Sequence, residues 1–195
     1  MRFYTTIQQI TIPKAIAVKA WQFANDVNST TDYSDTNQKD LKKIRLDHFV
    51  SKLGEEAVYA VLTKFGNITQ PDYNIYTAEQ KSWDDDLYFE TTGIAVKTML
   101  RSAATRFGLS WVFQSGTPRR DIILDKPEAW VFFVECDDTR LHNKLYELYV
   151  YPPYQVKELK FADPVLKKLV GHKLVVYADQ LPLLPGSDGK YQVFE

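Results

Sequence analysis

An acidic segment of the chain is followed directly by a basic one. Residues 79–90 contain one lysine and five acids, which are Glu79, Asp84, Asp85, Asp86 and Glu90. Residues 91–120 contain no acid and five cationic side chains, which are Lys97, Arg101, Arg106, Arg119 and Arg120. Carboxylates bind hard divalent cations such as Mg²⁺, and cationic groups bind phosphate. The two segments therefore suit metal-assisted phosphodiester chemistry, although a solvated loop beside exposed arginines would give the same charge pattern.

The strands expected around these charges would bring Asp86 and Lys97 together. Apolar runs predict one strand over 87–89 and a second over 94–99, joined by a two-residue turn at 92–93. Side chains alternate between the two faces of a strand. In this register Asp86 shares a face with Lys97 as its diagonal neighbour, about 7–8 Å away between Cβ atoms.

The same register assigns positions to the other acids of the hairpin. Glu90 would face Ala95 across the two strands, on the face that also carries Asp86 and Lys97. Asp85 would point to the opposite face. A slip of one residue in the turn would exchange the two faces, so the assignment depends on where the turn lies.

A long amphipathic helix is expected over 39–65, because apolar residues recur there at helical spacing and Gly66 ends the pattern. Gly54 is a position where this helix can break. At about 100° per residue, Glu55 lies at the margin of the apolar stripe, whereas Glu56 points into solvent. Glu55 can therefore lean over the edge of the sheet. It can equally be a simple ion-pair partner on a solvated helix, and the sequence favours neither role.

The whole pattern predicts one domain over 1–195 of mixed α/β class, with a central mixed β-sheet flanked by helices. No repeat, low-complexity tract or linker divides the chain. Loops are expected at 25–37 and 67–83. Further strands are expected at 7–12, 109–114, 130–136, 145–151 and 173–177, and further helices at 15–23, 101–107 and 161–170.

Composition excludes several classes of protein. The net charge is −1, so any binding of nucleic acid must come from local charge. The single cysteine, Cys136, rules out a cysteine metal cluster and indicates a reducing compartment, and its apolar neighbours predict a buried strand residue. No signal peptide is apparent, and no stretch approaches the ~20 apolar residues of a membrane span. The sequence therefore predicts a cytoplasmic protein.

Residues 53–114 resemble the PD-(D/E)XK, or restriction-endonuclease-like, nucleases, in particular their small phage and restriction-type members. Four segments carry the similarity in this order: Gly54-Glu55-Glu56-Ala57-Val58, Asp85-Asp86-Leu87, Ile94-Ala95-Val96-Lys97-Thr98 and Ser110-Trp111-Val112-Phe113-Gln114. The resemblance implies the restriction-endonuclease-like fold, with a motif-bearing core over about 44–136, and a bacterial or phage origin. It also implies two or three acids that hold Mg²⁺, with Mn²⁺ as a substitute, and a lysine near the attacking water.

Matched residue by residue, the resemblance assigns Glu55, Asp86 and Lys97 to the catalytic centre, with Asp86 as a metal ligand. Asp72 is the rival for the role of Asp86, because it follows Pro71 and so completes a literal Pro-Asp pair. Asp86 is preferred, since it precedes a strand that pairs with the lysine strand. Asp72 lies in a predicted loop among polar neighbours.

The chain departs from the family at Ala95, two residues before Lys97, where an acid usually stands. Glu90 could supply a relocated metal ligand, because the expected register places it opposite Ala95. Glu55 could also contribute a metal ligand from the helix. Otherwise the fold is retained and the chemistry is lost.

The resemblance implies a Mg²⁺-dependent endodeoxyribonuclease of the type II restriction kind, acting on double-stranded DNA as a homodimer with one site per strand. Two alternatives remain open: a structure-selective nuclease for Holliday junctions or repair, and a catalytically inactive DNA-binding or assembly protein. The basic segment offers contacts to DNA phosphates, although exposed arginines are often merely solvated. These candidate contacts are Arg101, Arg106, Gln114, Arg119 and Arg120.

Overall fold

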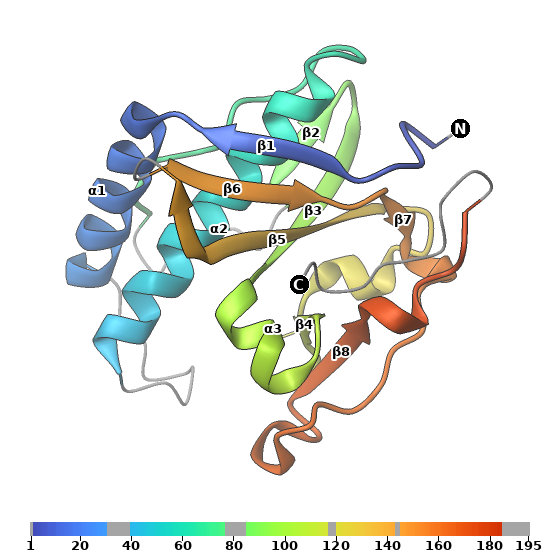
Figure 1. Ribbon diagram of the computed structural model, residues 1–195. Coiled ribbons are helices and arrows are strands. Elements are labelled where there is room, and N and C mark those ends of the chain that lie inside the picture. Colours follow the sequence, from blue (N-terminus) through green and yellow to red (C-terminus); the bar gives the residue numbers. More distant parts are fainter. Residues whose placement is uncertain (1, 31–39, 77–84, 117–119, 143–144, 185–195) are drawn as a thin grey trace.

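The computed structural model describes residues 2–30, 40–76, 85–116, 120–142 and 145–184 (Figure 1). The helices are α1 (Lys14–Thr30), α2 (Leu41–Leu62) and α3 (Arg101–Phe107). The strands are β1 (Gln8–Ile12), β2 (Leu87–Phe89), β3 (Thr92–Leu100), β4 (Ser110–Gln114), β5 (Trp130–His142), β6 (Leu145–Val150), β7 (Tyr154–Gln155) and β8 (Lys173–Tyr177). Short 3₁₀ turns are η2 (Ile122–Asp125), η3 (Val156–Glu158), η4 (Lys167–Leu169) and η5 (Ala178–Gln180).

The elements form a mixed α/β fold around one curled sheet. Its strand order is β1-β6-β5-β3-β2, and β7 pairs with the beginning of β5. β3 and β5 run parallel, whereas the other described pairs of this sheet are antiparallel. The predicted class and the mixed sheet are therefore confirmed. The restriction-endonuclease-like topology stays a prediction.

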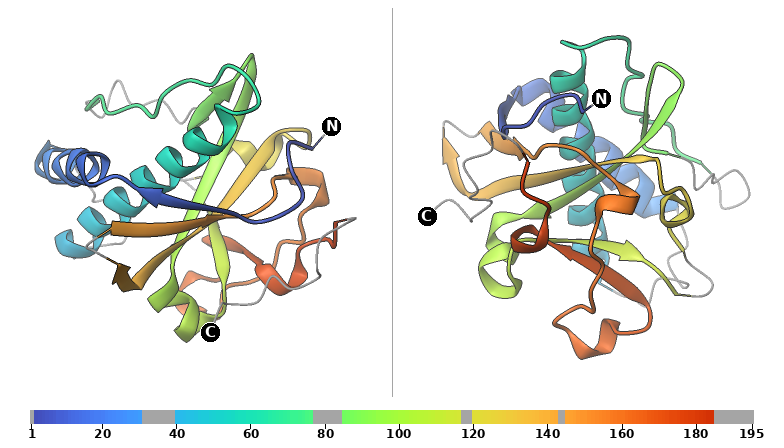
Figure 2. Two further views of the ribbon diagram at one scale, coloured as in Figure 1. Left: turned by 45° about the horizontal axis from the view of Figure 1, so that its top comes forward. Right: turned by 90° about the vertical axis from the view of Figure 1, so that its right-hand side faces the viewer.

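The two faces of the sheet are covered in different ways (Figure 2). α1 and α2 pack on one face and form the first apolar core with it. On the other face, a two-stranded sheet of β4 and β8 packs together with α3. The sequence predicted helices on both faces, but the helix expected at 161–170 is absent. Pro164 interrupts that segment, which contains only the short turn η4.

α2 confirms the predicted amphipathic helix and is not broken at Gly54. The carboxylate of Asp40 caps its first turn by accepting hydrogen bonds from the backbone N–H groups of Lys42 and Lys43, at 2.9 and 3.3 Å. At Gly54 the helix lies so close to β3 that a Cβ atom would overlap Oγ1 of Thr98. This glycine therefore permits the close approach of α2 that places Glu55 beside the sheet.

α1 is longer than the sequence predicted. Ala20, Ala24 and Val27 are all buried, and their spacing of four and three residues continues one helical face beyond residue 23. The loop expected from residue 25 was therefore wrong as far as Thr30. The remainder of that predicted loop, at 31–37, lies outside the described residues.

The predicted hairpin of β2 and β3 is present, but its turn lies elsewhere. Phe89 pairs with Thr92, so Glu90 and Thr91 form the turn in place of residues 92–93. Glu90 has a φ of 53°, in the left-handed region that few residues other than glycine adopt. The expected register, in which Glu90 faces the opposite strand, was therefore wrong.

The pairing of the hairpin is displaced by four residues from the expected register, and an even displacement keeps the side chains of 87–89 on their expected faces. The strand is irregular just before Leu87, because the backbone N–H of Asp86 donates to the carbonyl of Ile94, the partner of Leu87. The side chain of Asp85 lies against Gly93, on the face of β3 that also carries Ala95 and Lys97. The expected face of Asp85 was therefore wrong, and that of Asp86 stays a prediction.

Two further expectations can be compared with the structure. Cys136 is buried in β5, as predicted, and burial raises the pKa of its thiol to about 12. Among the described helices, none is both long enough and apolar enough to cross a bilayer.

Candidate active site

Charged side chains from four parts of the chain meet beside the β2–β3 hairpin. Glu55 comes from α2, Asp86 directly precedes β2, Lys97 lies on β3, and Asp121 directly precedes η2. The charges of Lys97 and Asp121 both act on Asp86, and the charge of Asp86 acts on Glu55. Asp86 thus lies within electrostatic reach of Glu55, of Lys97 and of Asp121, a residue that the sequence did not single out.

Asp86 is fixed to the neighbouring strand by two hydrogen bonds. Its backbone N–H donates to the carbonyl of Ile94 at 2.9 Å, and its Oδ2 accepts from the backbone N–H of Val96 at 2.7 Å. Asp86 keeps solvent access, but the protein packed around it removes part of the water that would stabilise its charge. This desolvation raises the pKa of Asp86, against the opposing effect of Lys97.

Glu55 is a buried carboxyl group, 6% exposed, with a buried cation as its partner. Nζ of Lys52 lies 2.6 Å from its Oε2, and the same ammonium stacks over the ring of Phe23 at 5.0 Å. Burial raises the pKa of Glu55 to about 8 in spite of Lys52, and the charge of Asp86 adds to the rise. Negative charge at Glu55 is therefore costly unless more positive charge is nearby.

Lys97 points to the side of the sheet that carries β4. Its Nζ lies 2.6 Å from Oδ2 of Asp121 and 5.0 Å from the ring centre of Phe113. The same Oδ2 also accepts a hydrogen bond from the backbone N–H of Gln114 at 3.1 Å. The ammonium group is therefore held at a defined place, between Asp121 and an aromatic face.

Two neighbouring acids of the hairpin have other partners. Asp85 pairs with Nζ of Lys126 at 2.9 Å, and its side chain lies against Gly93, on the face of β3 that carries Lys97, so the opposite face expected for it was wrong. The carboxylate of Glu90 accepts from the backbone N–H of Asn67 at 3.1 Å, which connects the turn to the segment after α2. Glu90 was nominated as a metal ligand because of the wrong register, and the structure does not bring it opposite Ala95. A third acid, at position 84, lies outside the described residues.

Asp72 does not join the site. It lies in an exposed loop, where its carboxylate accepts from the backbone N–H of Asn74 at 2.8 Å and from the hydroxyl of Tyr76 at 2.6 Å. These local bonds form a turn of the type common for aspartate. The structure therefore favours Asp86 over Asp72 as a member of the site, because the charge of Lys97 acts on Asp86.

The candidate DNA contacts differ in their surroundings. Arg106 is exposed on α3, and Gln114 is half-buried at the end of β4. Arg120 is exposed and pairs with Asp125 at 2.8 Å. Arg119 lies outside the described part of the chain. Arg106 and Gln114 thus remain available to a ligand. The guanidinium of Arg120 would have to bind a ligand while it pairs with Asp125, or exchange one for the other.

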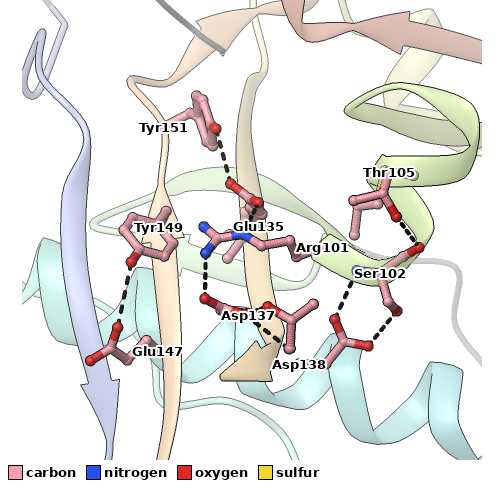
Figure 3. Close-up of polar contacts among 12 residues, drawn as sticks. Arg101, Ser102, Thr105, Glu135, Asp137, Asp138, Glu147, Tyr149 and Tyr151 are labelled. Atoms are coloured by element: carbon pink, nitrogen blue, oxygen red, sulfur yellow. Dashed lines mark hydrogen bonds and ion pairs between the residues drawn. The ribbon is translucent and has the colours of Figure 1, made fainter. Parts of the chain in front are cut away.

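Arg101 is a correction to the prediction, because it lies in the protein interior (Figure 3). Its Nε donates a hydrogen bond to Glu135 at 2.6 Å, and its Nη1 pairs with the carboxylate of Asp137. The hydroxyl of Tyr151 donates to Glu135 at 3.2 Å, and the ring of Tyr149 lies 4.8 Å from the guanidinium carbon. Two buried carboxylates require a buried cation, so Arg101 is structural rather than a contact to phosphate.

A divalent cation has suitable donors here, although they do not converge. Within the described ranges, no group of three His, Cys, Asp or Glu side chains lies close enough together to hold a metal ion. Glu55, Asp86 and Asp121 carry the oxygen donors that Mg²⁺ prefers. Burial raises the pKa of Glu55 and of Asp86, and a bound cation would relieve that cost. The donor chemistry therefore fits a hard cation, with Glu55 tied to Lys52 and Asp121 tied to Lys97 in the structure.

Sequence reasoning missed two members of this cluster. Asp121 is the first acid after the acid-free residues 91–120, and that position was the one available signal. A hydrogen bond from its backbone N–H to the carbonyl of Gln114, at the end of β4, holds it beside Lys97. The sequence allowed an ion pair of Glu55 on a solvated helix, whereas the structure forms this pair with Lys52 at a site where Glu55 is buried and Lys52 is part-buried.

No family model, no curated protein and no solved structure matches this chain. The function is therefore inferred from the residues and their arrangement.

Proposed function

We propose that this chain is a Mg²⁺-dependent endodeoxyribonuclease that hydrolyses phosphodiester bonds of double-stranded DNA. The observation that supports the proposal is the electrostatic coupling of Asp86, at the start of the hairpin, to Glu55 of α2 and to Lys97 of β3. Two carboxylates whose negative charge is costly, beside a fixed ammonium group, are suited to a cation and a phosphate together. The order of these residues along the chain agrees with the resemblance to the PD-(D/E)XK nucleases.

Each side chain has its own task in this proposal. Asp86 and Glu55 offer oxygen donors for Mg²⁺, and Asp86 keeps the solvent access that a substrate needs. Lys97 supplies a positive charge that can hold a phosphate oxygen and stabilise the charge that develops on it. When bound, Mg²⁺ would supply Lewis-acid activation of the phosphate and of the attacking water.

The proposal includes a homodimer of the type II restriction kind. One such site can cut one strand at a time, so that a double-strand break requires either two sites or two events. Two copies related by a two-fold axis would present one site to each strand of a palindromic sequence. A nuclease selective for branched DNA is the alternative that differs only in its substrate.

A catalytically inactive DNA-binding or assembly protein is the second candidate. Two observations favour it: position 95 carries alanine, and the ion pairs of Glu55 with Lys52 and of Lys97 with Asp121 neutralise the site internally. Such internal pairs could stabilise the fold without any ligand.

Cleavage of supercoiled plasmid with Mg²⁺ and with EDTA tests the proposal. We expect the wild type to cut the plasmid in Mg²⁺ and not in EDTA. Asp86→Asn and Lys97→Ala should each lower the cleavage rate by about 100-fold or more. Lys157→Ala is the matched control, because its ammonium also pairs at 2.6 Å with an acid, Glu128, but at the surface. This control should cut like the wild type.

The pattern of products separates the candidates. Discrete fragments support the restriction-type enzyme, and cutting confined to a four-way junction supports the structure-selective nuclease. Tight binding without cutting favours the inactive protein. Wild-type rates in the Asp86 and Lys97 variants would show that the assigned site is wrong.

A further inference from the structure

A basic surface lies outside the candidate site, on the segment that leads into β8. Residues 160–173 contain four lysines and a single acid, Asp163. Three of these lysines are exposed and have no acid partner among the described residues, and they are Lys160, Lys167 and Lys168. Lys157, just before this segment, pairs instead with Glu128 at 2.6 Å. The segment therefore presents positive charge that the protein does not neutralise.

The same segment exposes apolar side chains at 163–172, which we call the basic loop. Val165 is 63% exposed, Leu166 38% and Val170 44%. They lie directly before and after the two adjacent lysines and Leu169. In Figure 1 and in the right-hand view of Figure 2, the basic loop forms the lowest part of the molecule. Exposed apolar side chains beside unpaired charge, on a projecting loop, are typical of an interaction surface.

Backbone hydrogen bonds hold both ends of the basic loop. Just before it, Ala162 and Val175 exchange two hydrogen bonds, each of 2.9 Å. At its end, the carbonyl of His172 accepts from the backbone N–H groups of Ser115 and Gly116, both at 3.0 Å. The base of the loop is therefore fixed, and a fixed base lowers the conformational entropy that binding would cost.

The base of the basic loop adjoins the candidate site. Ser115 and Gly116, which hold the loop, directly follow Gln114 at the end of β4. The backbone N–H of Gln114 donates to Oδ2 of Asp121 at 3.1 Å, and the same oxygen pairs with Nζ of Lys97 at 2.6 Å. A short series of contacts thus connects the loop to the ammonium group that is proposed to hold a phosphate.

Duplex DNA is the partner that these features favour. Its backbone is a regular row of negative charges, which suits lysines without acid partners. Between the phosphates, the grooves offer sugars and base edges, against which DNA-binding proteins place aliphatic side chains. An anionic membrane would also attract lysines and aliphatic groups. The connection to Lys97 favours DNA, because one ligand can then contact both the site and the loop.

We propose that the basic loop is a second contact to DNA, in which Lys167 and Lys168 bind phosphates while Val165 and Leu166 lie in the groove between them. This inference rests on the proposed nuclease function and adds an anchoring surface outside the catalytic centre. Only the charged contacts release counterions from DNA, so only they depend steeply on salt. The charged and the apolar contributions can therefore be measured separately.

Fluorescence anisotropy of a labelled duplex with the full chain, in EDTA and at several salt concentrations, tests the charged contribution. The double variant Lys167→Ala with Lys168→Ala should bind more weakly and lower the log–log salt slope by about 1.8, or about 0.9 for each phosphate contact. Lys14→Ala with Lys42→Ala is the matched control. Both lysines are exposed, and they begin α1 and α2 on the opposite face of the sheet. This control should retain the wild-type slope.

The double variant Val165→Ser with Leu166→Ser tests the apolar contribution in the same assay. We expect binding about fivefold weaker or more, with the salt slope unchanged, because aliphatic contacts release no counterions. Val18→Ser is the control, since Val18 is 61% exposed but lies on α1. Thermal unfolding of each variant verifies that folded proteins are compared.

The possible failures are distinguishable. If the wild type binds and cuts DNA while the lysine variant retains its affinity and slope, the basic loop is not a DNA contact and the nuclease proposal stands. Wild-type affinity in the Val165 and Leu166 variant would overturn the groove contact. Binding of the wild type to vesicles of phosphatidylserine and phosphatidylcholine, without binding to DNA, would assign the loop to a membrane surface. If the wild type neither binds nor cuts DNA, both proposals fail.

Discussion

At the scale of single residues, Glu55 shows how packing changes the acidity of an ordinary carboxyl group. A glutamate at the margin of an amphipathic helix usually extends into solvent, where its charge costs little. Here the close approach of α2 to the sheet buries it beside Lys52 and within reach of the charge of Asp86. The helix pattern predicted its direction but gave no measure of its burial.

The raised pKa of Glu55 makes the stability of the protein depend on pH. Between its ordinary value of 4.5 and its folded value of about 8, the folded protein retains a proton that the unfolded chain has lost. The contribution of Glu55 to stability is therefore complete below about pH 4.5 and is lost as the pH rises through about 8. Glu55→Gln removes this titration. Relative to the wild type, the variant should become more stable as the pH increases from 5 to 8.

Urea unfolding of both proteins at several pH values measures this difference. The absolute stability of Glu55→Gln also includes the altered pairing of Lys52, so the change of the difference with pH is the informative quantity. A difference that stays constant from pH 5 to pH 8 would contradict the assigned environment of Glu55.

Substitution of two arginines of the basic segment should affect different properties, stability for Arg101 and DNA binding for Arg106. Arg101→Ala leaves Glu135 and Asp137 buried without their cation, which should cost about 3–5 kcal/mol of unfolding free energy. Arg106 is exposed, so Arg106→Ala should change stability by less than about 0.5 kcal/mol. If Arg106 contacts a phosphate, its loss should reduce the salt dependence of DNA binding by about 0.9 in log–log slope. Urea unfolding and binding at several salt concentrations separate the two effects.

At the scale of elements, the contact of α2 with β3 determines how the site is assembled. Gly54 meets Thr98 directly, and the next residue of the helix is Glu55. Thr98 belongs to β3, one residue after Lys97. The same contact thus sets the distance between the helix that carries one candidate ligand and the strand that carries the lysine.

Gly54→Ala should therefore disturb both the fold and the site. The added Cβ would overlap Oγ1 of Thr98, so helix and strand must separate, at a cost of about 1–3 kcal/mol. Addition of Thr98→Ala removes the nearest atom and should recover part of this loss. Urea unfolding of the single and double variants provides the measurement. An unchanged free energy of unfolding in Gly54→Ala would show that the contact is not tight.

Periodicity predicted the elements far better than their connections. α2, the hairpin strands and the buried strand around Cys136 all followed from the spacing of apolar residues, because that spacing reflects burial directly. The turn was misplaced, since Thr92-Gly93 carries the stronger turn signal while Glu90 adopts the left-handed backbone instead. The ion-pair partner of Lys97 is Asp121, which the register did not predict.

The parts of the site that could not be predicted depend on loops. Asp121 reaches Lys97 only because the chain turns back after β4 and its N–H bonds to Gln114. No local spacing encodes such a contact. Likewise, the sequence indicates a surface cation at Arg101, because its buried partners, Glu135 and Asp137, lie more than thirty residues later on β5.

At the scale of the whole molecule, the candidate site lies where two layers meet. Glu55 comes from the layer of α1 and α2, whereas Asp121 belongs to the layer around β4 and β8. Lys97 and Asp86 lie on the hairpin between these layers. The proposed site therefore requires both sides of the sheet to be covered, and its residues come from segments far apart in the sequence.

The proposed homodimer makes a prediction about which products a mixed dimer yields. A dimer of two wild-type chains has two sites, so it should convert supercoiled plasmid to the linear form in one encounter. A heterodimer of wild-type and Lys97→Ala chains, purified with two different tags, has one site and should give nicked circles. Linear product from the heterodimer at the wild-type rate would mean that one site cuts both strands. A monomer by light scattering, with and without DNA, would contradict the dimer itself, and cutting by that monomer would assign each break to independent events.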